Sequence, residues 1–573
     1  MNIRLLHRLC TPAFMVLVLV ALAVAPLGAQ EALPRNETLY VAGMHWGSVD
    51  TFNPNHPNPD WPSQGENQYL YESLFVFNLL TGDIEPLLAA GMTFVDDLTI
   101  EIPLRDGTRW QDGTPLTAED VVFTYKLAWD HDDLDYSVFR DYVTDVVATD
   151  DRTIQMKLNP ERLNVGLVKR YLSNVHILPQ HIWAERAASD TPLSQYVDLE
   201  PVGSGPYKVL DYSIERIALV RDDNYWGIPV FGTPAPKYVV HPIFGSNDEG
   251  NLAFQRGNVD LSQQFAPQIW KMWEEQNLPV GTWFAEEPYH VPGNIPLLHL
   301  NITRPGLDNV LVRRALAYAI NYEQIAATAM SRYSTPVQPS LIIPEGGEAK
   351  FFDAEQVAEL GWEYNPDKAK EILEVELGAT KGDDGIYVLP DGTRLGPYTI
   401  LASFGWTDWQ TAVEIVAQNA TEAGIDVTTE YPEAPTVISR RNVGDFDMVI
   451  WTHSGATPAS PWQRFRDTLD KRGVPDFGEA AFWNWNRFSH PDVPDLLDQA
   501  AAATDEETQR QLFSALDRIF LENIPVIPLM YRPLEFYEFN ESVWTGFPTA
   551  SNPVAPPMHE EAGIQIFSVI QPK

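Results

Sequence analysis

The residues best suited to chemistry in this sequence are tryptophans that follow predicted strands. Trp406, Asp408 and Trp409 come after a predicted strand over 398–402 and before a predicted amphipathic helix over 412–423. An indole face can stack on a sugar ring, and a carboxylate can accept hydrogen bonds from two neighbouring hydroxyls. Ligands of open α/β folds collect at such strand ends. We therefore expect these three side chains to bind a polyhydroxyl ligand.

Three further tryptophans occupy comparable positions. Trp451 ends a predicted buried strand over 446–451, and Trp462 follows the loop after that strand. Trp46 follows the first predicted strand, over 38–42, and is expected to face the others from a different domain of the chain. The chain has 17 tryptophans, so the alternative for any one of them is a place in the core. Their positions after strands make Trp46, Trp451 and Trp462 predicted ligand-binding residues.

Patterns that would indicate an enzyme are missing. The sequence has no nucleophile elbow, no Ser–His–Asp signature and no metal motif, and its 12 histidines are scattered without ligand spacing. A glycoside hydrolase needs two carboxylates placed across the scissile bond, and nothing distinguishes such a pair among 79 acidic residues. We predict a binding protein, not an enzyme, with no catalytic residues, no metal and no cofactor.

Length and charge narrow the class of protein. At 573 residues the chain is too long for one core and predicts about three or four domain-sized units. Its formal net charge of −40 repels nucleic acid and anionic lipid. We therefore expect no nucleic-acid partner.

Residues 1–29 have the pattern of a secretory signal peptide. A basic start and an apolar run over 14–24 precede small residues, which predicts cleavage after Ala29. The apolar run is too short to span a membrane. The single cysteine, Cys10, lies before this run and cannot carry a lipoprotein anchor. We expect a periplasmic or secreted protein without a lipid anchor.

The middle of the chain predicts a strand, a turn and a helix. Leu298, Leu300 and Ile302 alternate with polar residues as in a strand, and Pro305-Gly306 stops it. Asp308 or Asn309 can cap the following helix. The apolar face of that helix consists of Leu311, Ala315, Leu316 and Ala319, and we expect Arg313 and Arg314 to lie away from it.

The amino-acid sequence of this segment, and those of several others, resemble the family 5 extracellular solute-binding proteins of ABC importers. A hairpin with two Asp-Gly turns precedes a helix that Thr117-Ala-Glu-Asp120 caps. The segments that carry the resemblance are Leu298-His-Leu-Asn-Ile302, Tyr69-Leu-Tyr-Glu-Ser-Leu-Phe75, Arg105-Asp-Gly-Thr-Arg-Trp-Gln-Asp-Gly113, Pro201-Val-Gly-Ser-Gly-Pro-Tyr-Lys-Val209, Asn224-Tyr-Trp-Gly227 and Ile524-Pro-Val-Ile-Pro-Leu-Met-Tyr531.

The resemblance covers essentially all of the chain after the signal segment. It implies an α/β, two-lobed periplasmic-binding-protein fold of the large cluster C type, with an extra small domain inserted in the first lobe. The implied first lobe comprises 30–75, 200–297 and 532–573, the inserted domain 76–199, and the second lobe 298–531. It also implies a monomer that captures a ligand by hinge closure and delivers it to membrane permease subunits.

Two segments resemble the cellobiose- and β-oligosaccharide-binding branch of that family. They are Gly405-Trp-Thr-Asp-Trp409 and Val543-Trp-Thr-Gly-Phe-Pro-Thr549 with Ala-Ser-Asn-Pro553 after it. In that branch a tryptophan-bearing loop after this strand lines the cleft, which carries over to Trp406 and Trp409, and less closely to Trp46. The resemblance therefore implies an oligosaccharide ligand.

A peptide ligand is the alternative within the same family. Peptide binders of the family place an aspartate soon after the strand that corresponds to 446–451, where it pairs with the terminal amine. Here residues 452–462 contain no acid, and a charged amine buried without a partner costs several kcal/mol. Asp408 or Asp467 could substitute, so the peptide alternative remains open. Nickel is the least favoured of the family's ligands.

Overall fold

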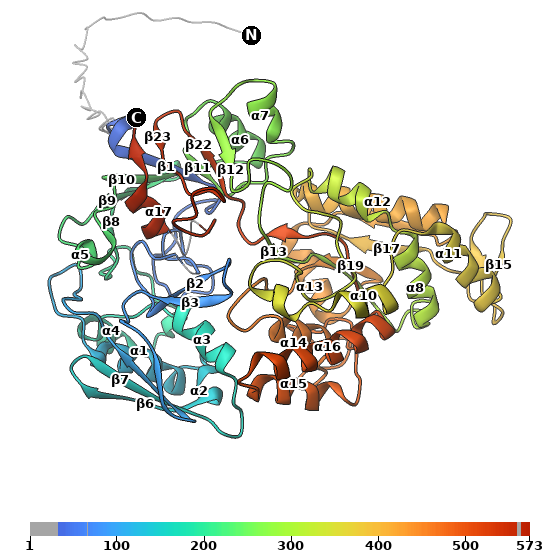
Figure 1. Cartoon of the computed structure of the whole chain (residues 1–573), viewed down its shortest axis with the longest axis horizontal. Helices are drawn as coiled ribbons and strands as arrows, with labels where there is room; N and C mark the ends of the chain where they lie inside the picture. Colours follow the sequence, from blue (N-terminus) through green and yellow to red (C-terminus); the bar gives the residue numbers. More distant parts are fainter. Residues whose placement is uncertain (1–32, 66, 559–562) are drawn as a thin grey trace, which may run out of the picture. The chain divides into compact units, whose positions relative to one another are not determined.

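The computed structural model describes residues 33–65, 67–558 and 563–573. One compact unit, Arg35–Lys573, carries the fold. The predicted signal segment 1–29, with Cys10, lies outside the described residues. Two main β-sheets and one smaller sheet organise the unit (Figure 1).

The first main sheet has seven strands, and we call it with its helices the first lobe. β1 lies near its middle and pairs in parallel with β10 and β11. The strand order is β12 (Val280–Thr282), β22 (Glu538–Asn540), β11 (Leu261–Ser262), β1 (Thr38–Ala42), β10 (Tyr238–Pro242), β9 (Arg216–Arg221) and β8 (Tyr207–Tyr212). Its helices are α5 (Ile228–Phe231), α6 (Asn247–Gln255), α7 (Trp270–Glu274) and α17 (Gly563–Val569).

The second main sheet has five strands, and we call it with its helices the second lobe. Its order is β18 (Val427–Glu430), β17 (Tyr398–Leu401), β19 (Met448–Trp451), β14 (Leu297–Leu300) and β20 (Val526–Pro528). β17 runs parallel to β18 and β19, so the carboxyl ends of these three strands share one edge. The helices of this lobe are α8 (Val310–Ala319), α10 (Ala354–Leu360), α11 (Pro366–Glu371), α12 (Thr407–Glu422), α13 (Ala434–Val443), α14 (Trp462–Leu469), α15 (Val493–Ala502) and α16 (Glu506–Asn523).

A smaller unit, which we call the small domain, lies in sequence between β1 and β8. Its antiparallel sheet has the order β4 (Thr93–Asp96), β5 (Thr99–Pro103), β7 (Thr153–Leu158) and β6 (Val143–Asp150). It also contains the hairpin of β2 (Phe75–Asn78) and β3 (Asp83–Pro86), with α1 (Ala118–Asp130), α2 (Phe139–Tyr142), α3 (Val165–Asn174) and α4 (Gln180–Ala187). The predicted capping box at the start of α1 is present: the Thr117 amide donates to Asp120 Oδ2 at 2.9 Å.

The chain crosses between the main sheets twice, and the two crossing segments pair with each other. β13 (Pro292–Asn294) leads from β12 of the first sheet to β14 of the second. β21 (Arg532–Pro533) leads from β20 back to β22. These short strands run antiparallel, with Asn294 opposite Arg532. The connection between the two lobes therefore includes a short two-stranded antiparallel pair.

The predicted strand, turn and helix in the middle of the chain are confirmed as β14 and α8, with one correction. Asn309 caps α8 by accepting the Leu311 amide at 2.9 Å. The expectation that Arg313 lies away from the buried face is wrong, because its side chain is buried. Its guanidinium donates to the Leu307, Asn523 and Ile524 carbonyls, two of which lie where α16 ends.

A buried carboxylate joins two of the sequence signatures. Glu72 accepts hydrogen bonds from the Tyr225 hydroxyl at 2.5 Å and from Trp226 Nε1 at 2.7 Å. All three side chains are buried. Burial raises the pKa of Glu72 to about 7, although both hydrogen bonds oppose this shift. The segments 69–75 and 224–227 are therefore coupled by a shared acceptor.

We expect Glu72→Ala to lower the free energy of unfolding by about 2–5 kcal/mol, because it leaves a buried hydroxyl and a buried indole N–H without an acceptor. Urea unfolding followed by circular dichroism measures the change. Glu161→Ala, at an exposed position, should alter stability by less than about 0.5 kcal/mol. A Glu72→Ala protein as stable as this control would contradict the structural role.

Candidate ligand-binding site

Three of the predicted tryptophans form one cluster at the carboxyl ends of β17 and β19. Leu401 of β17 pairs with Val449 of β19, two residues before Trp451. The turn after β17 contains Gly405 with φ of +82°, and α12 begins directly after Trp406. The ring centroids of Trp406 and Trp451 lie 5.3 Å apart, tilted by 37°. The parallel pairing of the two strands therefore brings residues 45 positions apart into contact.

The three indoles differ in what they offer a ligand. Trp406 is 38% exposed, whereas Trp409 is only 5% exposed. Trp409 meets Trp406 edge-on at 4.8 Å and Trp451 edge-on at 5.5 Å. Trp406 is thus the ring with free surface, and Trp409 and Trp451 support it from below. We call these three residues the tryptophan cluster.

Asp408 is oriented by an ion pair. Its side chain is buried, and Arg532 Nε on β21 lies 3.2 Å from Asp408 Oδ2. Arg532 belongs to one of the crossing segments, so this pair links the loop of the tryptophan cluster to the connection between the lobes. The predicted role of Asp408 toward ligand hydroxyls stays a prediction.

Trp46 lies on a first-lobe loop that is well anchored. His241 Nε2 accepts the Met44 and His45 amides, both at 3.1 Å, and Asp60 Oδ2 accepts the Thr51 amide at 2.5 Å. Trp46 itself is 47% exposed. Within the described part of the chain it makes no ring contact with the tryptophan cluster.

Trp462 is the first residue of α14 and lies apart from the tryptophan cluster. Its Nε1 donates to the Leu497 carbonyl at 2.8 Å, which fixes the ring against α15. The ring lines a cavity of about 1030 Å³. Of the six predicted site residues, Trp462 is the one that lines this cavity.

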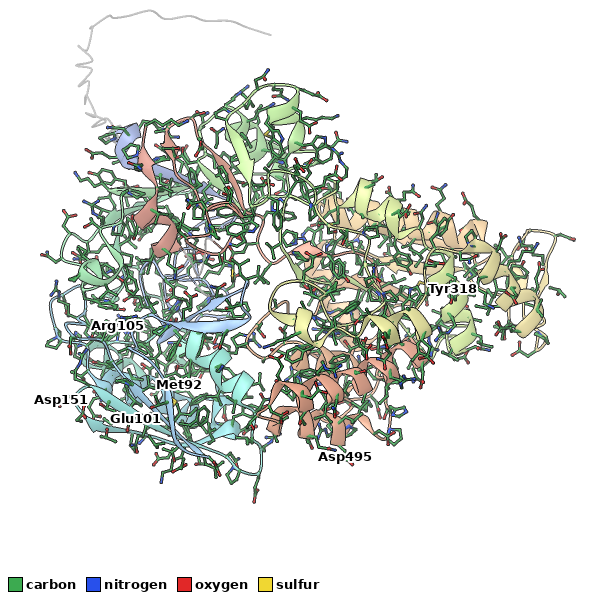
Figure 2. The ribbon with its side chains drawn as sticks, in the orientation of Figure 1. Met92, Glu101, Arg105, Asp151, Tyr318 and Asp495 are labelled. Carbon is green, nitrogen blue, oxygen red and sulfur yellow. The ribbon has the colours of Figure 1, made fainter. Side chains whose placement is uncertain are left out.

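The cavity lies between the small domain and the second lobe. Its walls are the β2–β3 hairpin, residues 92–98, the start of α3, and the second-lobe segments 343–351, 456–462 and 500–513. Met92, labelled in Figure 2, belongs to the small-domain wall. A volume of this size is at the upper end of ordinary ligand pockets.

The two walls of the cavity touch each other at glycines. A Cβ atom on Gly347 would lie 2.3 Å from the Gly82 Cα, and one on Gly166 would lie 3.0 Å from the Pro458 carbonyl oxygen. Arg170 Nη1 donates to Gln463 Oε1 across the same boundary, at 2.8 Å. The absence of side chains at these glycines permits direct backbone contact between the small domain and the second lobe.

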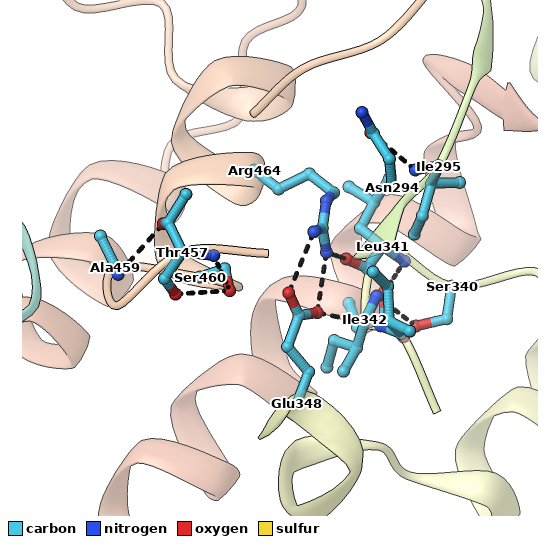
Figure 3. A network of polar contacts seen from close by, with 12 residues as sticks. Asn294, Ile295, Ser340, Leu341, Ile342, Glu348, Thr457, Ala459, Ser460 and Arg464 are labelled. Atoms are coloured by element: carbon cyan, nitrogen blue, oxygen red, sulfur yellow. Dashed lines mark hydrogen bonds and ion pairs between the residues drawn. The ribbon is translucent and has the colours of Figure 1, made fainter. Parts of the chain in front are cut away.

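A buried ion pair fixes the second-lobe wall (Figure 3). Arg464 of α14 donates to Glu348 from both terminal nitrogens, at 2.8 and 3.0 Å, and to the Leu341 carbonyl at 2.7 Å. Glu348 also accepts the Ile343 amide at 3.0 Å. Two parallel charge-assisted hydrogen bonds hold a planar guanidinium firmly. Residues 341–348, part of which line the cavity, are therefore held against α14.

A second buried carboxyl group holds the neighbouring residues. Asp517 accepts the Ser340 hydroxyl at 2.8 Å and the Leu341 amide at 3.1 Å. Burial raises the pKa of Asp517 to about 7. Among the described residues, no three His, Cys, Asp or Glu side chains converge as a metal site.

Arg441, Trp485 and Arg532 contact or extend the tryptophan cluster and were absent from the predicted site. Arg441 of α13 lies 4.1 Å from the Trp451 ring and 3.9 Å from the Trp485 ring. In the sequence, Arg440-Arg441 resembles a solvated pair near a helix end. No local signal in the sequence distinguishes the buried Arg441 from the part-exposed Arg440.

Comparison with known proteins identifies the family. Residues 83–473 match the model for the middle segment of bacterial extracellular solute-binding proteins, family 5, and the chain belongs to this family. The predicted membership of this family is confirmed. The chain is thus an extracellular solute-binding protein of the ABC-importer kind.

Individual relatives agree with this assignment. A mannohexaose-bound periplasmic oligopeptide-binding protein of an oligopeptide ABC transporter from Thermotoga maritima is 30% identical, with a TM-score of 0.83 over 95% of this chain and 100% of that one. The uncharacterized protein y4wM of Sinorhizobium fredii is 27% identical over 529 residues, covering 85% of this chain and 77% of that protein. The probable peptide-binding protein YejA of Agrobacterium fabrum is 26% identical over 483 residues, covering 78% and 76%.

The structural match confirms the predicted α/β, two-lobed periplasmic-binding-protein fold. Proteins of this family bind solutes for transport and are not enzymes. In the part of the chain that the structure describes, no helix has both the length and the apolar character needed to cross a membrane.

The buried Asp517 predicts a specific pH dependence. Because its folded-state pKa is near 7, the folded protein keeps a proton that the unfolded chain loses above its ordinary pKa near 4. The contribution of Asp517 to the free energy of unfolding therefore falls as pH rises from about 4 to about 7. Asp517→Asn cannot ionise, so its stability relative to wild type should rise by about 2–4 kcal/mol across this window.

Urea unfolding at pH 4 and pH 8 measures this difference. Asp505→Asn serves as a control without this pH dependence, because the Thr508 amide lowers the pKa of Asp505 and the group therefore titrates below its ordinary value near 4. Its stability relative to wild type should stay nearly constant between pH 4 and pH 8. An Asp517→Asn protein whose difference from wild type is independent of pH would contradict the buried, protonated carboxyl group.

Proposed function

We propose that this protein is the substrate-binding component of an ABC importer that captures an oligosaccharide of the cellobiose or β-glucan type. The ligand would lie between the lobes and be delivered to a membrane permease. The family assignment supports the transport role. The proposed division is 30–75, 200–297 and 532–573 for the first lobe, 76–199 for the inserted domain and 298–531 for the second lobe.

The exposed ring of Trp406 carries the proposal for a sugar ligand. Trp406 stands on Trp409 and Trp451 at the edge where the carboxyl ends of parallel strands meet. A supported, half-exposed indole presents a rigid apolar face, and the axial C–H groups of a sugar ring can lie flat on it. Its support by two other rings limits the conformational entropy lost on binding.

Two further observations support an oligosaccharide of several units. The cavity of about 1030 Å³ between the small domain and the second lobe has room for a long ligand. A relative that is 30% identical over 95% of this chain has been solved with mannohexaose bound. Trp462 on the cavity wall and Trp46 on the first lobe would extend the set of contacts beyond Trp406.

Closure of the two lobes would strengthen the binding of the ligand. A ligand that contacts both lobes binds the closed state more tightly and so shifts the population toward it. Closure about the paired crossings β13 and β21 excludes water, which strengthens each hydroxyl hydrogen bond. We propose that the protein acts as a monomer.

Peptide binding is the second candidate, favoured by the name of the relative YejA. The environment of the acids argues against it. Asp408 is paired with Arg532, and Asp467 is buried and paired with Arg466. Neither carboxylate is left without a cationic partner to receive a peptide amine, and 452–462 supplies no other.

Calorimetric titration distinguishes the two ligands. We expect cello-oligosaccharides to bind with micromolar or tighter dissociation constants and to be recovered unchanged, while a mixture of di- and tripeptides gives no heat of binding. Mannohexaose serves as an oligosaccharide of a different monosaccharide, because mannose differs from glucose in its configuration at C2. Peptide binding with no response to any sugar would overturn the oligosaccharide proposal and leave the transport role in place.

Truncation of a residue of the tryptophan cluster should weaken sugar binding selectively. Trp406→Ala is expected to cost about 1–3 kcal/mol of binding free energy, as the loss of one stacking surface does for nucleic-acid bases. Trp409→Ala is expected to cost a similar amount because it removes the support below Trp406. Trp129→Ala, which removes a partly exposed tryptophan from the small domain, is the control. Unchanged calorimetric affinity in both cluster variants would remove this loop from the site.

A further inference from the structure

A buried cation lies between two indoles directly behind the tryptophan cluster. The Arg441 guanidinium is 4.1 Å from the centroid of Trp451 and 3.9 Å from that of Trp485. The residue is only 7% exposed. Trp485 in turn stacks on His453, with centroids 4.7 Å apart and planes 13° apart. Arg441 is thus an interior part of a column of rings whose outer end is Trp406.

Arg441 has no carboxylate partner among the described residues, which is unusual for a buried arginine. Its Nε and Nη2 donate to Asn442 Oδ1 at 3.1 and 2.8 Å, and its Nη1 finds no acceptor in the described chain. The preceding residue is quite different. Arg440 is part-exposed and pairs with Glu430 at 2.9 Å and Asp445 at 3.4 Å.

The two indole faces are what compensate the buried charge. Burial lowers the pKa of Arg441 to about 9, so the side chain remains a cation near neutral pH. An unpaired charge in the interior is costly, whereas attraction to an indole face grows stronger when water is excluded. Moving Trp451 away from the guanidinium would therefore strand the charge. The cation consequently restrains Trp451 in one orientation.

Restraint of Trp451 extends to Trp406. Arg441 covers a face of Trp451, and Trp406 and Trp409 pack against the same indole, tilted and edge-on. Trp451 is half-buried among these neighbours. Its role in the cluster is to connect the fixed interior to the exposed ring of Trp406.

On the basis of the proposed function, we propose that Arg441 is a positioning residue of the sugar-binding platform, acting on Trp406 through Trp451. A direct contact between Arg441 and an anionic ligand would require a reachable N–H group, but the unpartnered Nη1 is buried. The guanidinium therefore sets the geometry of the platform without touching the ligand.

The test compares Arg441→Met and Arg441→Lys with the matched control Arg440→Met. Three quantities are measured: the near-ultraviolet circular dichroism without ligand, the dissociation constant for a cello-oligosaccharide, and the thermal midpoint. Replacing a buried charge by an apolar side chain of similar length often leaves stability unchanged or raises it. A structural role alone would change the midpoint and the near-ultraviolet spectrum, because Arg441 contacts two indoles, but it would leave the dissociation constant unchanged.

We expect Arg441→Met to lose near-ultraviolet signal and to bind the sugar about tenfold more weakly, with cooperative unfolding retained. Arg441→Lys should recover part of both, because an ammonium group still attracts indole faces. Arg440→Met should match wild type. If Arg441→Met fails to fold, Trp485→Phe tests the same claim, because it weakens the aromatic contact on the side of the guanidinium away from Trp451. About the same loss of affinity is expected.

Wild-type spectrum and affinity in Arg441→Met would overturn the positioning role, as would wild-type affinity in Trp485→Phe. If the wild-type protein binds no sugar, the oligosaccharide proposal fails instead. In that case the near-ultraviolet spectrum still tests whether Arg441 orders the indoles that it contacts, because this measurement needs no ligand, and a wild-type spectrum in Arg441→Met would overturn that restraint.

Discussion

The parallel pairing of β17 with β19 is the constraint on which the candidate site depends. Because both strands end at the same edge of the sheet, the loops that follow them must meet. The turn after β17 supplies Trp406, the first turn of α12 supplies Trp409, and the end of the other strand supplies Trp451. β14 pairs with β19 on its other side and places Leu297 opposite Trp451. The strand that brings the chain into the second lobe thus also anchors the cluster.

Charge and aromatic rings are combined around this edge in two ways. Asp408 is held by Arg532 from a crossing strand, so the start of α12 is connected to a segment that joins the two lobes. Arg441 is held by indole faces instead of a carboxylate. The first arrangement ties the site to the connection between the lobes, and the second holds the indoles behind Trp406 in place.

Local patterns in the sequence predicted the elements well where one face is clearly apolar or a cap is present. The 38–42 strand, the helix after Asn309 and the capping box at Thr117 were all predicted from such signals and are present. The sequence placed Trp406 and Trp451 at strand ends, but it did not predict their contact, which depends on the pairing of β17 with β19. The family resemblance supplied what local patterns could not, namely the two-lobed arrangement.

The errors and omissions arise where the partner is distant in sequence. Arg313 is buried because carbonyls at the end of α16, more than two hundred residues later, accept its hydrogen bonds. Arg441 is buried because Trp485 closes over it, and nothing near position 441 indicates this. Trp409 is buried while Trp406 is exposed, although they lie only three residues apart: Trp406 precedes α12 and Trp409 is in its first turn, where the sequence predicted a loop before a helix over 412–423. Which individual residue of a segment is buried depends on packing between elements, which periodicity alone does not determine.

The central claim is that a sugar ring rests on Trp406. Fluorine nuclear magnetic resonance of protein labelled with 5-fluorotryptophan tests it directly, with the Trp406 resonance assigned by its loss in Trp406→Phe. On addition of a cello-oligosaccharide the account predicts a large shift of the Trp406 resonance and none for the fully buried Trp183 of the small domain. A sugar that binds while the Trp406 resonance stays in place would contradict the account.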